Sequence, residues 1–141
     1  RYISVTGVQT CALPISFVRQ ALAGKPITVH GDGQQSRCFC SVFDVVEALM
    51  RLPQTPAAAG QIVNVGSQEE ISMAGLAERI LKRTGSKSEL SYIPYDEAFG
   101  DGFDDMRRRV PSLDRIGELT GWKPRHTLDE IIDQVVADQR A

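Results

Sequence analysis

The segment at residues 31–37, GDGQQSR, constrains the fold of this chain more than any other. Two glycines around an aspartate predict a tight turn, because glycine reaches positive φ angles at no steric cost. The β-branched residues of 26–30 predict a strand before the turn, and the alternation of Arg37, Phe39 and Ser41 predicts a second strand after it. A helical pattern over 44–52 follows, so the expected order is strand, turn, strand, helix.

The turn also indicates a function. An open glycine turn lets a ligand approach the backbone closely, and Arg37 leaves the turn with a planar fork of five N–H donors that suits a phosphate. The local sequence is equally compatible with a plain hairpin turn that carries a surface arginine. The turn alone therefore leaves both interpretations open.

The composition is that of one globular domain. The chain has 141 residues, of which 42% are hydrophobic and 24% charged, with a formal net charge of -2. This balance gives no general attraction to nucleic acid or to anionic membranes, so binding to either would need a local basic patch. No apolar run approaches the roughly 20 residues of a membrane span. The first residues also lack the charged start of a signal peptide, and we expect a cytoplasmic protein.

Three cysteines, Cys11, Cys38 and Cys40, are an odd number with no neighbouring cluster of cysteine or histidine. We therefore expect reduced thiols and no metal site. Cys38 and Cys40 lie two residues apart on the predicted strand, where they would share one face and pack as small apolar groups.

Hydrophobic periodicity and cap residues predict the other elements. Helices are predicted over 17–24, 44–52, 72–85 and 112–121 and from 127 onward, with Asp44, Ser72, Ser112 and Thr127 as caps. Strands are predicted at 90–93 and at 61–66, the latter as a parallel strand covered on both faces. Residues 95–105 predict an exposed loop, and Trp122 is expected to pack where the last two helices meet.

The beginning of the chain does not fit this pattern. Residues 5–15 show neither helical nor strand periodicity, and residues 3–16 are similar to the translation of an adapter oligonucleotide used in high-throughput sequencing. We therefore divide the chain into residues 1–16, an artefactual or disordered arm, and residues 17–141, the domain. The alternative is a genuine, irregular N-terminal arm.

Six short segments occur in the order and spacing of one protein family: FVRQAL at 17–22, TVHGDG at 28–33, RCF at 37–39 with Val42 and DVV at 44–46, NVG at 64–66, RVPS at 109–112 and LTGWKP at 119–124. From Phe17 to its end the chain resembles the C-terminal part of an NAD-dependent nucleotide-sugar epimerase/dehydratase, an extended short-chain dehydrogenase/reductase. The members that it resembles most are UDP-glucose 4-epimerase-like and UDP-glucuronate decarboxylase-like.

This resemblance implies an α/β fold, namely an incomplete Rossmann-like fold with its C-terminal strands and helices plus the small substrate-binding subdomain. It implies a nucleoside-diphosphate-sugar site in which two arginines contact the diphosphate, an acid hydrogen-bonds the ribose, and a histidine replaces the usual tyrosine beside the base. The residues concerned are Arg37 and Arg109, Asp105, His30, and the turn residues Gly31, Asp32 and Gly33. Asp44 matches a family aspartate that we interpret as a helix cap and not as a catalyst.

The resemblance further implies that the parent protein is a homodimer and that its preceding, N-terminal Rossmann portion holds NAD. Neither a Gly-rich dinucleotide turn nor a Tyr-x-x-x-Lys pair occurs in this sequence, since Tyr92 and Tyr95 have no lysine four residues later. We therefore assign no catalytic residue, and we expect the isolated chain neither to hold NAD nor to turn over substrate.

Two other functions are compatible with the sequence. Arg107, Arg108 and Arg109 could serve a small RNA-binding or polyanion-binding module, whose affinity would fall steeply with salt. Alternatively, the fragment binds nothing because its site is half built and its strand edges are exposed. The acidic balance and the lack of aromatic residues between the arginines favour the nucleotide-sugar site.

Overall fold

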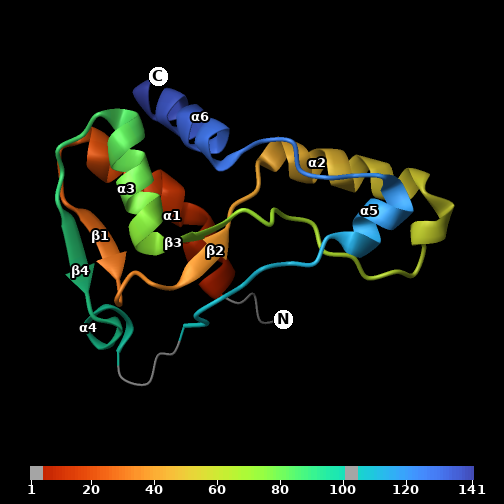
Figure 1. The fold of residues 1–141 in the computed structure, drawn as a ribbon, viewed down its shortest axis with the longest axis horizontal. Coiled ribbons are helices and arrows are strands. Elements are labelled where there is room, and N and C mark those ends of the chain that lie inside the picture. Colours follow the sequence, from red (N-terminus) through yellow and green to blue (C-terminus); the bar gives the residue numbers. More distant parts are fainter. Residues whose placement is uncertain (1–4, 101–104) are drawn as a thin grey trace.

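The computed structural model describes residues 5–100 and 105–141. In chain order its elements are α1 (Val5–Leu22), β1 (Ile27–His30), β2 (Ser36–Cys38), α2 (Val42–Arg51), the short 3-10 turns η1 (Leu52–Gln54) and η2 (Pro56–Ala58), β3 (Glu70–Ser72), α3 (Met73–Thr84), β4 (Leu90–Ile93), α4 (Tyr95–Phe99), α5 (Asp114–Thr120) and α6 (Leu128–Arg140). Figure 1 shows a large lobe that contains α1, α3, α6, β1 and β4, and an extension that contains α2, η1, η2 and α5.

The large lobe is built on a short parallel sheet. β1 pairs with β4, so that Ile27 lies opposite Leu90 and His30 lies opposite Ile93. The helices α1, α3 and α6 pack against one another and, with β1, enclose the main core. Its largest fully buried members include Phe17, Val18, Ile27, Val29, Leu76, Ile80 and Ile132. The mixed α/β architecture confirms the α/β part of the predicted fold class.

The glycine turn connects two different sheets. β2 pairs antiparallel with β3, so that Arg37 lies opposite Ile71, whereas β1 pairs only with β4 among the described strands. Ser36 also forms an isolated bridge with Arg108. The segment is therefore strand, turn, strand, helix as predicted, but it is not a hairpin, because its two strands pair elsewhere.

Two predicted helix caps are confirmed. The Ser72 hydroxyl accepts a hydrogen bond from the backbone N–H of Gly75 at 3.1 Å, and Gly85 ends α3 with a φ of 68°. At the start of α6, Thr127 and Glu130 form both hydrogen bonds of a capping box. These caps depend on residues within one turn of the helix end, so the sequence alone predicts them.

The other helix starts differ from the prediction. α1 begins at Val5 and continues through Pro14 and Phe17, so the predicted start at Phe17 is wrong. α2 begins at Val42 with Ser41 as its N-cap, and Asp44 lies inside the helix. α5 begins at Asp114 after Leu113, although the Ser112 hydroxyl still accepts a hydrogen bond from the Asp114 N–H at 3.4 Å.

A short helix, α4, forms where an irregular loop was predicted. Pro94 precedes α4, and the acidic residues Asp96 and Glu97 occupy its first turn, where they complement the helix dipole. Residues 101–104 of the predicted loop lie outside the described residues. The division of the chain at residue 16 stays a prediction, and residues 1–4 of that arm also lie outside the described part.

The predicted strand at 61–66 is wrong. This segment has no regular secondary structure, no described strand pairs with it, and Ile62 is 85% exposed. Its other face contributes Val63 and Val65 to a small core in the extension. The expected burial on both faces is therefore also wrong, since Ile62 is exposed, and a strand requires a partner for its backbone.

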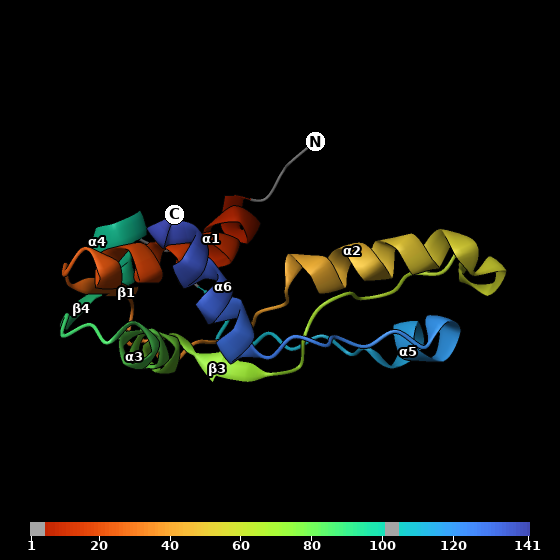
Figure 2. The ribbon, with the colours of Figure 1, turned by 90° about the horizontal axis from the view of Figure 1, so that it is seen from above.

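The extension has its own core, formed by Ala48, Ile116 and Trp122. The Trp122 indole N–H donates to the carbonyl of Asp44 at 3.0 Å. Trp122 thus packs between α2 and α5 and not between the last two helices, which corrects the prediction. Figure 2 shows α2 and α5 side by side in this extension, away from α6.

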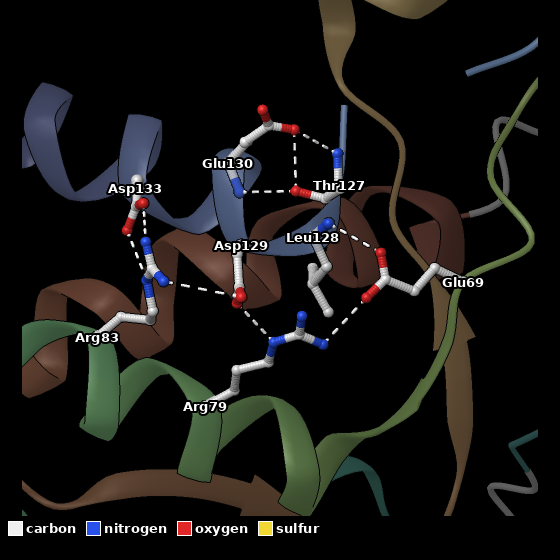
Figure 3. Close-up of polar contacts among 8 residues, drawn as sticks. All are labelled: Glu69, Arg79, Arg83, Thr127, Leu128, Asp129, Glu130 and Asp133. Atoms are coloured by element: carbon white, nitrogen blue, oxygen red, sulfur yellow. Dashed lines mark hydrogen bonds and ion pairs between the residues drawn. The ribbon is translucent and has the colours of Figure 1, made fainter. Parts of the chain in front are cut away.

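A ladder of ion pairs joins α3 to α6 on the surface of the large lobe (Figure 3). Arg79 contacts Asp129 at 2.6 Å and Glu69 at 3.0 Å, and Arg83 pairs with Asp133. Glu69 also accepts a hydrogen bond from the Leu128 N–H at 2.9 Å, at the first residue of α6. Arg79 therefore connects the two helices and the segment before β3.

We expect Arg79→Ala to lower the free energy of unfolding by about 0.5 to 1 kcal/mol at low salt, because the pairs are partly exposed and screened by water. The loss should shrink at high salt, since ions screen surface pairs. Denaturant titration at two salt concentrations measures this effect. Arg140→Ala, at the end of α6, is the control and should change stability little; an equal loss at both salt concentrations would contradict the expected ionic contribution.

Within residues 5–100 and 105–141, no helix combines the length and the apolar character needed to cross a membrane.

Candidate functional site

A pocket of about 910 Å³ lies where the large lobe meets the extension. Its walls come from α1 (Pro14 and Ile15), the segment 37–43 with Val45, the segments 64–67 and 109–112, and the face of α6 that carries Ile131 and Val135. Its volume is within the range of small-molecule sites. Both Arg37 and Arg109 line it, although they are far apart in the sequence.

Arg37 is held rigidly at the edge of this pocket. The residue is only 3% exposed, and its Nη1 donates to the carbonyls of Ser36 at 2.6 Å and Met106 at 2.7 Å. Its Nη2 pairs with Asp105 at 2.5 Å. β2 therefore positions the side chain, and the segment after residue 104 supplies Asp105 and Met106 as its further partners. The Nε–H and one Nη2–H have no partner among the described residues.

The three consecutive arginines have different surroundings. Arg107 pairs with Asp32 at 2.7 Å, and Arg108 pairs with Glu70 at 2.9 Å. Arg109 is exposed, lines the pocket and makes no side-chain hydrogen bond or ion pair with any described residue. Two of the three charges are thus already balanced, which counts against a continuous polyanion-binding patch.

Both glycines of the turn pack closely against side chains from other segments. Gly31 has a φ of 68°, and a Cβ at this position would lie 2.4 Å from Cε2 of Tyr95. Gly33 has a φ of 70°, and its Cβ would lie 3.1 Å from Ala74, Tyr92 and Val29. At Gly31 the Tyr95 ring occupies the space that a side chain would need, so this position requires glycine, and the approach of a ligand to the turn stays a prediction.

An aromatic cluster that was not predicted from the sequence lies beside the turn. The His30 ring meets the Phe99 ring edge-on at a centroid distance of 5.0 Å, and burial lowers the pKa of His30. Tyr95 donates to Asp105 at 3.3 Å. Burial and the charge of Asp105 raise the pKa of Tyr95 to about 12, so the phenol stays a hydrogen-bond donor. The available signal was the aromatic spacing Tyr95 to Phe99, one helical turn apart.

The predicted site residues form two groups. Arg37 and Arg109 line the pocket, whereas His30, Gly31, Asp32 and Gly33 lie around the aromatic cluster and do not line it. The ion pair between Arg37 and Asp105 connects the two groups. Asp32 closes the turn, since its carboxylate accepts the Gln34 N–H at 3.0 Å and pairs with Arg107, and these contacts lower its pKa.

Asp44 links the extension to the large lobe. The residue is 1% exposed, and its carboxylate accepts the backbone N–H groups of Arg125 and His126, both at 3.1 Å. The His126 ring lies 2.8 Å from its second oxygen. Burial alone would raise the pKa of Asp44, but the hydrogen bonds from His126 and Arg125 outweigh burial and lower it. Asp44 thus holds the segment before α6 and is not the N-cap of α2, which corrects the prediction.

Cys38 and Cys40 both line the pocket as partly buried thiols. Burial raises the pKa of both, and that of Cys40 reaches about 11, so neither is an activated nucleophile. Cys11 lies where side chains are not described. Among the described residues, no group of three or more histidine, cysteine or acidic side chains could hold a metal ion.

The described residues do not fit a dinucleotide cofactor by themselves. A dinucleotide turn joins a strand to a helix N-terminus that faces the pyrophosphate. Here the turn at 31–35 leads from β1 into β2, so its backbone N–H groups are not followed by a helix. The turn at 31–35 is therefore not a dinucleotide turn of this kind.

A curated relative shares much of this sequence. The UDP-N-acetyl-alpha-D-glucosaminuronate decarboxylase of Bacillus cytotoxicus is 29% identical over 141 residues, which cover 96% of this chain and 44% of the decarboxylase. The chain therefore spans less than half the length of this relative.

Solved structures share the fold. An epimerase from Methanothermobacter thermautotrophicus matches with a TM-score of 0.79 and 24% identity over 89% of this chain and 36% of that chain. The UDP-glucuronic acid 4-epimerase of Bacillus cereus, in complex with UDP-glucuronic acid and NAD, matches with a TM-score of 0.77 and 19% identity over 89% of this chain and 39% of that chain. Homologous structures thus hold a UDP-sugar and NAD.

The family model described as GDP-mannose 4,6 dehydratase matches residues 9–135, which is most of the chain. The sequence motifs, the fold and the family model all indicate the same class of protein. The chain therefore belongs to this family of NAD-dependent nucleotide-sugar epimerases, dehydratases and decarboxylases, and it represents part of the length of such a protein.

Proposed function

We propose that this chain supplies the part of a nucleotide-sugar epimerase, dehydratase or decarboxylase that binds the nucleoside diphosphate of the substrate. The observation that carries the proposal is that Arg37 and Arg109, from distant segments, line one pocket. Two guanidinium groups that reach a common cavity suit a diphosphate, because each can donate two parallel hydrogen bonds to phosphate oxygens. UDP-glucuronic acid, the ligand of the Bacillus cereus epimerase, represents the proposed class of substrate.

The two arginines act differently in this proposal. Arg109 is exposed and has no partner among the described residues, so its charge is available to a phosphate. Arg37 is fixed by two carbonyls and Asp105, so it offers its remaining N–H groups in a fixed orientation. Such preorganisation lowers the entropy cost of binding. NAD would supply the hydride chemistry from the parts of a full-length family member that lie outside this chain.

We expect Arg109→Ala to weaken UDP binding by about 10- to 100-fold, because a charge-assisted hydrogen bond contributes about 1.5 to 3 kcal/mol. Isothermal titration of the 141-residue chain with UDP measures the affinity. Arg108→Ala is the matched control, since this neighbour pairs with Glu70 and does not line the pocket.

Two results would contradict the proposal. One is an unchanged affinity in Arg109→Ala. The other is an equal loss of affinity in Arg108→Ala, which would indicate a diffuse cationic patch. A comparison of UDP with an RNA oligonucleotide at rising salt separates these cases, because a polyanion binder loses affinity steeply with salt.

A further inference from the structure

Tyr95 does not line the pocket, but its ring is held in one place. The residue begins α4 directly after β4, and its ring lies where a side chain at position 31 would have to go. Gly31 is tied to the end of β4, because its N–H donates to the carbonyl of Ile93 at 2.8 Å. The Phe99 ring, one helical turn later, lies 6.1 Å from the Tyr95 ring. Figure 1 shows α4 next to the ends of β1 and β4, where these contacts meet.

The Tyr95 hydroxyl reaches the pocket through Asp105. It donates to one oxygen of the Asp105 carboxylate at 3.3 Å, and the other oxygen pairs with Nη2 of Arg37 at 2.5 Å. Burial and the charge of Asp105 raise the pKa of Tyr95 to about 12, so the phenol keeps the proton that it donates at neutral pH. Tyr95, Asp105 and Arg37 therefore form a chain of polar contacts from the glycine turn to the pocket.

The backbone at Asp105 is held without the help of Tyr95. The Ser36 N–H donates to the carbonyl of Arg107 at 2.8 Å, and Ser36 also forms the bridge with Arg108. These main-chain contacts fix the segment 105–108 on β2. The Asp105 side chain, in contrast, has two hydrogen-bond partners among the described residues, Tyr95 and Arg37. The hydroxyl of Tyr95 therefore affects the orientation of the carboxylate and not the path of the chain.

The orientation of Arg37 depends in turn on this carboxylate. Nη1 of Arg37 is taken by two carbonyls, and Asp105 is its ionic partner within the described part of the chain. We propose that Tyr95 is a positioning residue for Arg37: through Asp105 it fixes the guanidinium plane, so that the remaining N–H groups are presented to the pocket. The inference rests on the proposed function, because the ligand of Arg37 is the diphosphate. A fixed donor group loses less entropy on binding.

Tyr95→Phe tests this role, because it removes the hydroxyl and keeps the ring beside Gly31. The affinity for UDP, measured by isothermal titration of the 141-residue chain, should fall by about 3- to 10-fold, which is the range for one ordinary hydrogen bond. Tyr92→Phe is the matched control. The Tyr92 ring lies close to Gly33, and its hydroxyl has no hydrogen bond to a described residue, so its removal should leave the affinity unchanged. An unchanged affinity in Tyr95→Phe, or an equal loss in Tyr92→Phe, overturns the proposal.

A double-mutant cycle distinguishes positioning from a general effect on the fold. In an Arg37→Lys background, Tyr95→Phe should change the affinity for UDP by less than about 2-fold, because lysine has no planar fork for Asp105 to orient. A merely structural role of the hydroxyl would cost the same factor in both backgrounds. A loss in the Arg37→Lys background as large as in the unchanged chain therefore overturns the proposal.

The orientation of Arg37 can also be measured without a ligand, which separates this inference from the nucleotide site. In nitrogen-15 NMR of the free chain, rotation of the Arg37 guanidinium about its Nε–Cζ bond should become at least about 3-fold faster in Tyr95→Phe and stay unchanged in Tyr92→Phe. If the unchanged chain does not bind UDP but Tyr95→Phe speeds this rotation, the proposed function fails and the positioning of Arg37 by Tyr95 is supported. An unchanged rotation rate in Tyr95→Phe overturns the positioning role whether or not UDP binds.

Discussion

Asp44→Ala is expected to lower the free energy of unfolding by about 3 kcal/mol or more, because removing a buried charged partner leaves its donors unsatisfied. Asp44 is almost fully buried and accepts hydrogen bonds from Arg125, from the His126 backbone and from the His126 ring. Without the carboxylate, these groups lose their partner at the junction between the extension and the large lobe. Denaturant titration followed by the fluorescence of Trp122 measures the loss.

Glu47→Ala is the control for this experiment. Glu47 lies one turn after Asp44 on the same helix and pairs with Arg51 and Arg125 near the surface. Its removal should cost less than about 1 kcal/mol, as for other surface ion pairs. Similar losses in Asp44→Ala and Glu47→Ala would show that Asp44 does not hold the two lobes together.

The contribution of Asp44 should also depend on pH. The pKa of Asp44 in the folded chain is lower than its ordinary value. Its contribution is therefore fully present above the unfolded pKa of about 3.9 and is lost as the pH falls through the folded pKa. The difference in stability between the unchanged chain and Asp44→Ala should accordingly decrease below about pH 4.

Gly31→Ala is the second change with a large expected effect, a loss of about 3 kcal/mol. A residue with a side chain costs about 1 to 2 kcal/mol in the left-handed region, and the steric clash adds about 1 to 3 kcal/mol. The clash arises because the new Cβ would lie 2.4 Å from Cε2 of Tyr95. Thermal or denaturant unfolding measures the total.

Gly24→Ala separates the two contributions. Gly24 has nearly the same φ, 65°, but nothing lies within 4 Å of its Cβ position. It should therefore lose only the backbone part, about 1 to 2 kcal/mol. Removing the ring with Tyr95→Ala should reduce the additional cost of Gly31→Ala, which a double-mutant cycle detects. A loss at Gly31 no larger than at Gly24 would contradict a close contact with Tyr95.

The proposed diphosphate site depends on which residues line the pocket. Arg37 and Arg109 line the same cavity, but their contact with a diphosphate remains a prediction. The sequence singles out Arg37 because this residue leaves a glycine turn. It could not predict that Asp105 pairs with Arg37, since the two residues come together only through the fold. The enclosure of Gly31 by Tyr95 was missed for the same reason.

Local chemistry explains which elements the sequence determined by itself. The Ser72 cap, the left-handed Gly85 and the Thr127/Glu130 capping box involve residues within a few positions of one another, so their energies depend little on the rest of the chain. Only the tertiary structure decided that β1 pairs with β4, that segment 61–65 has no partner among the described strands, and that Asp44 binds residues near 126. These outcomes depend on contacts between distant segments, and hydrophobic periodicity identifies an apolar face without specifying what covers it.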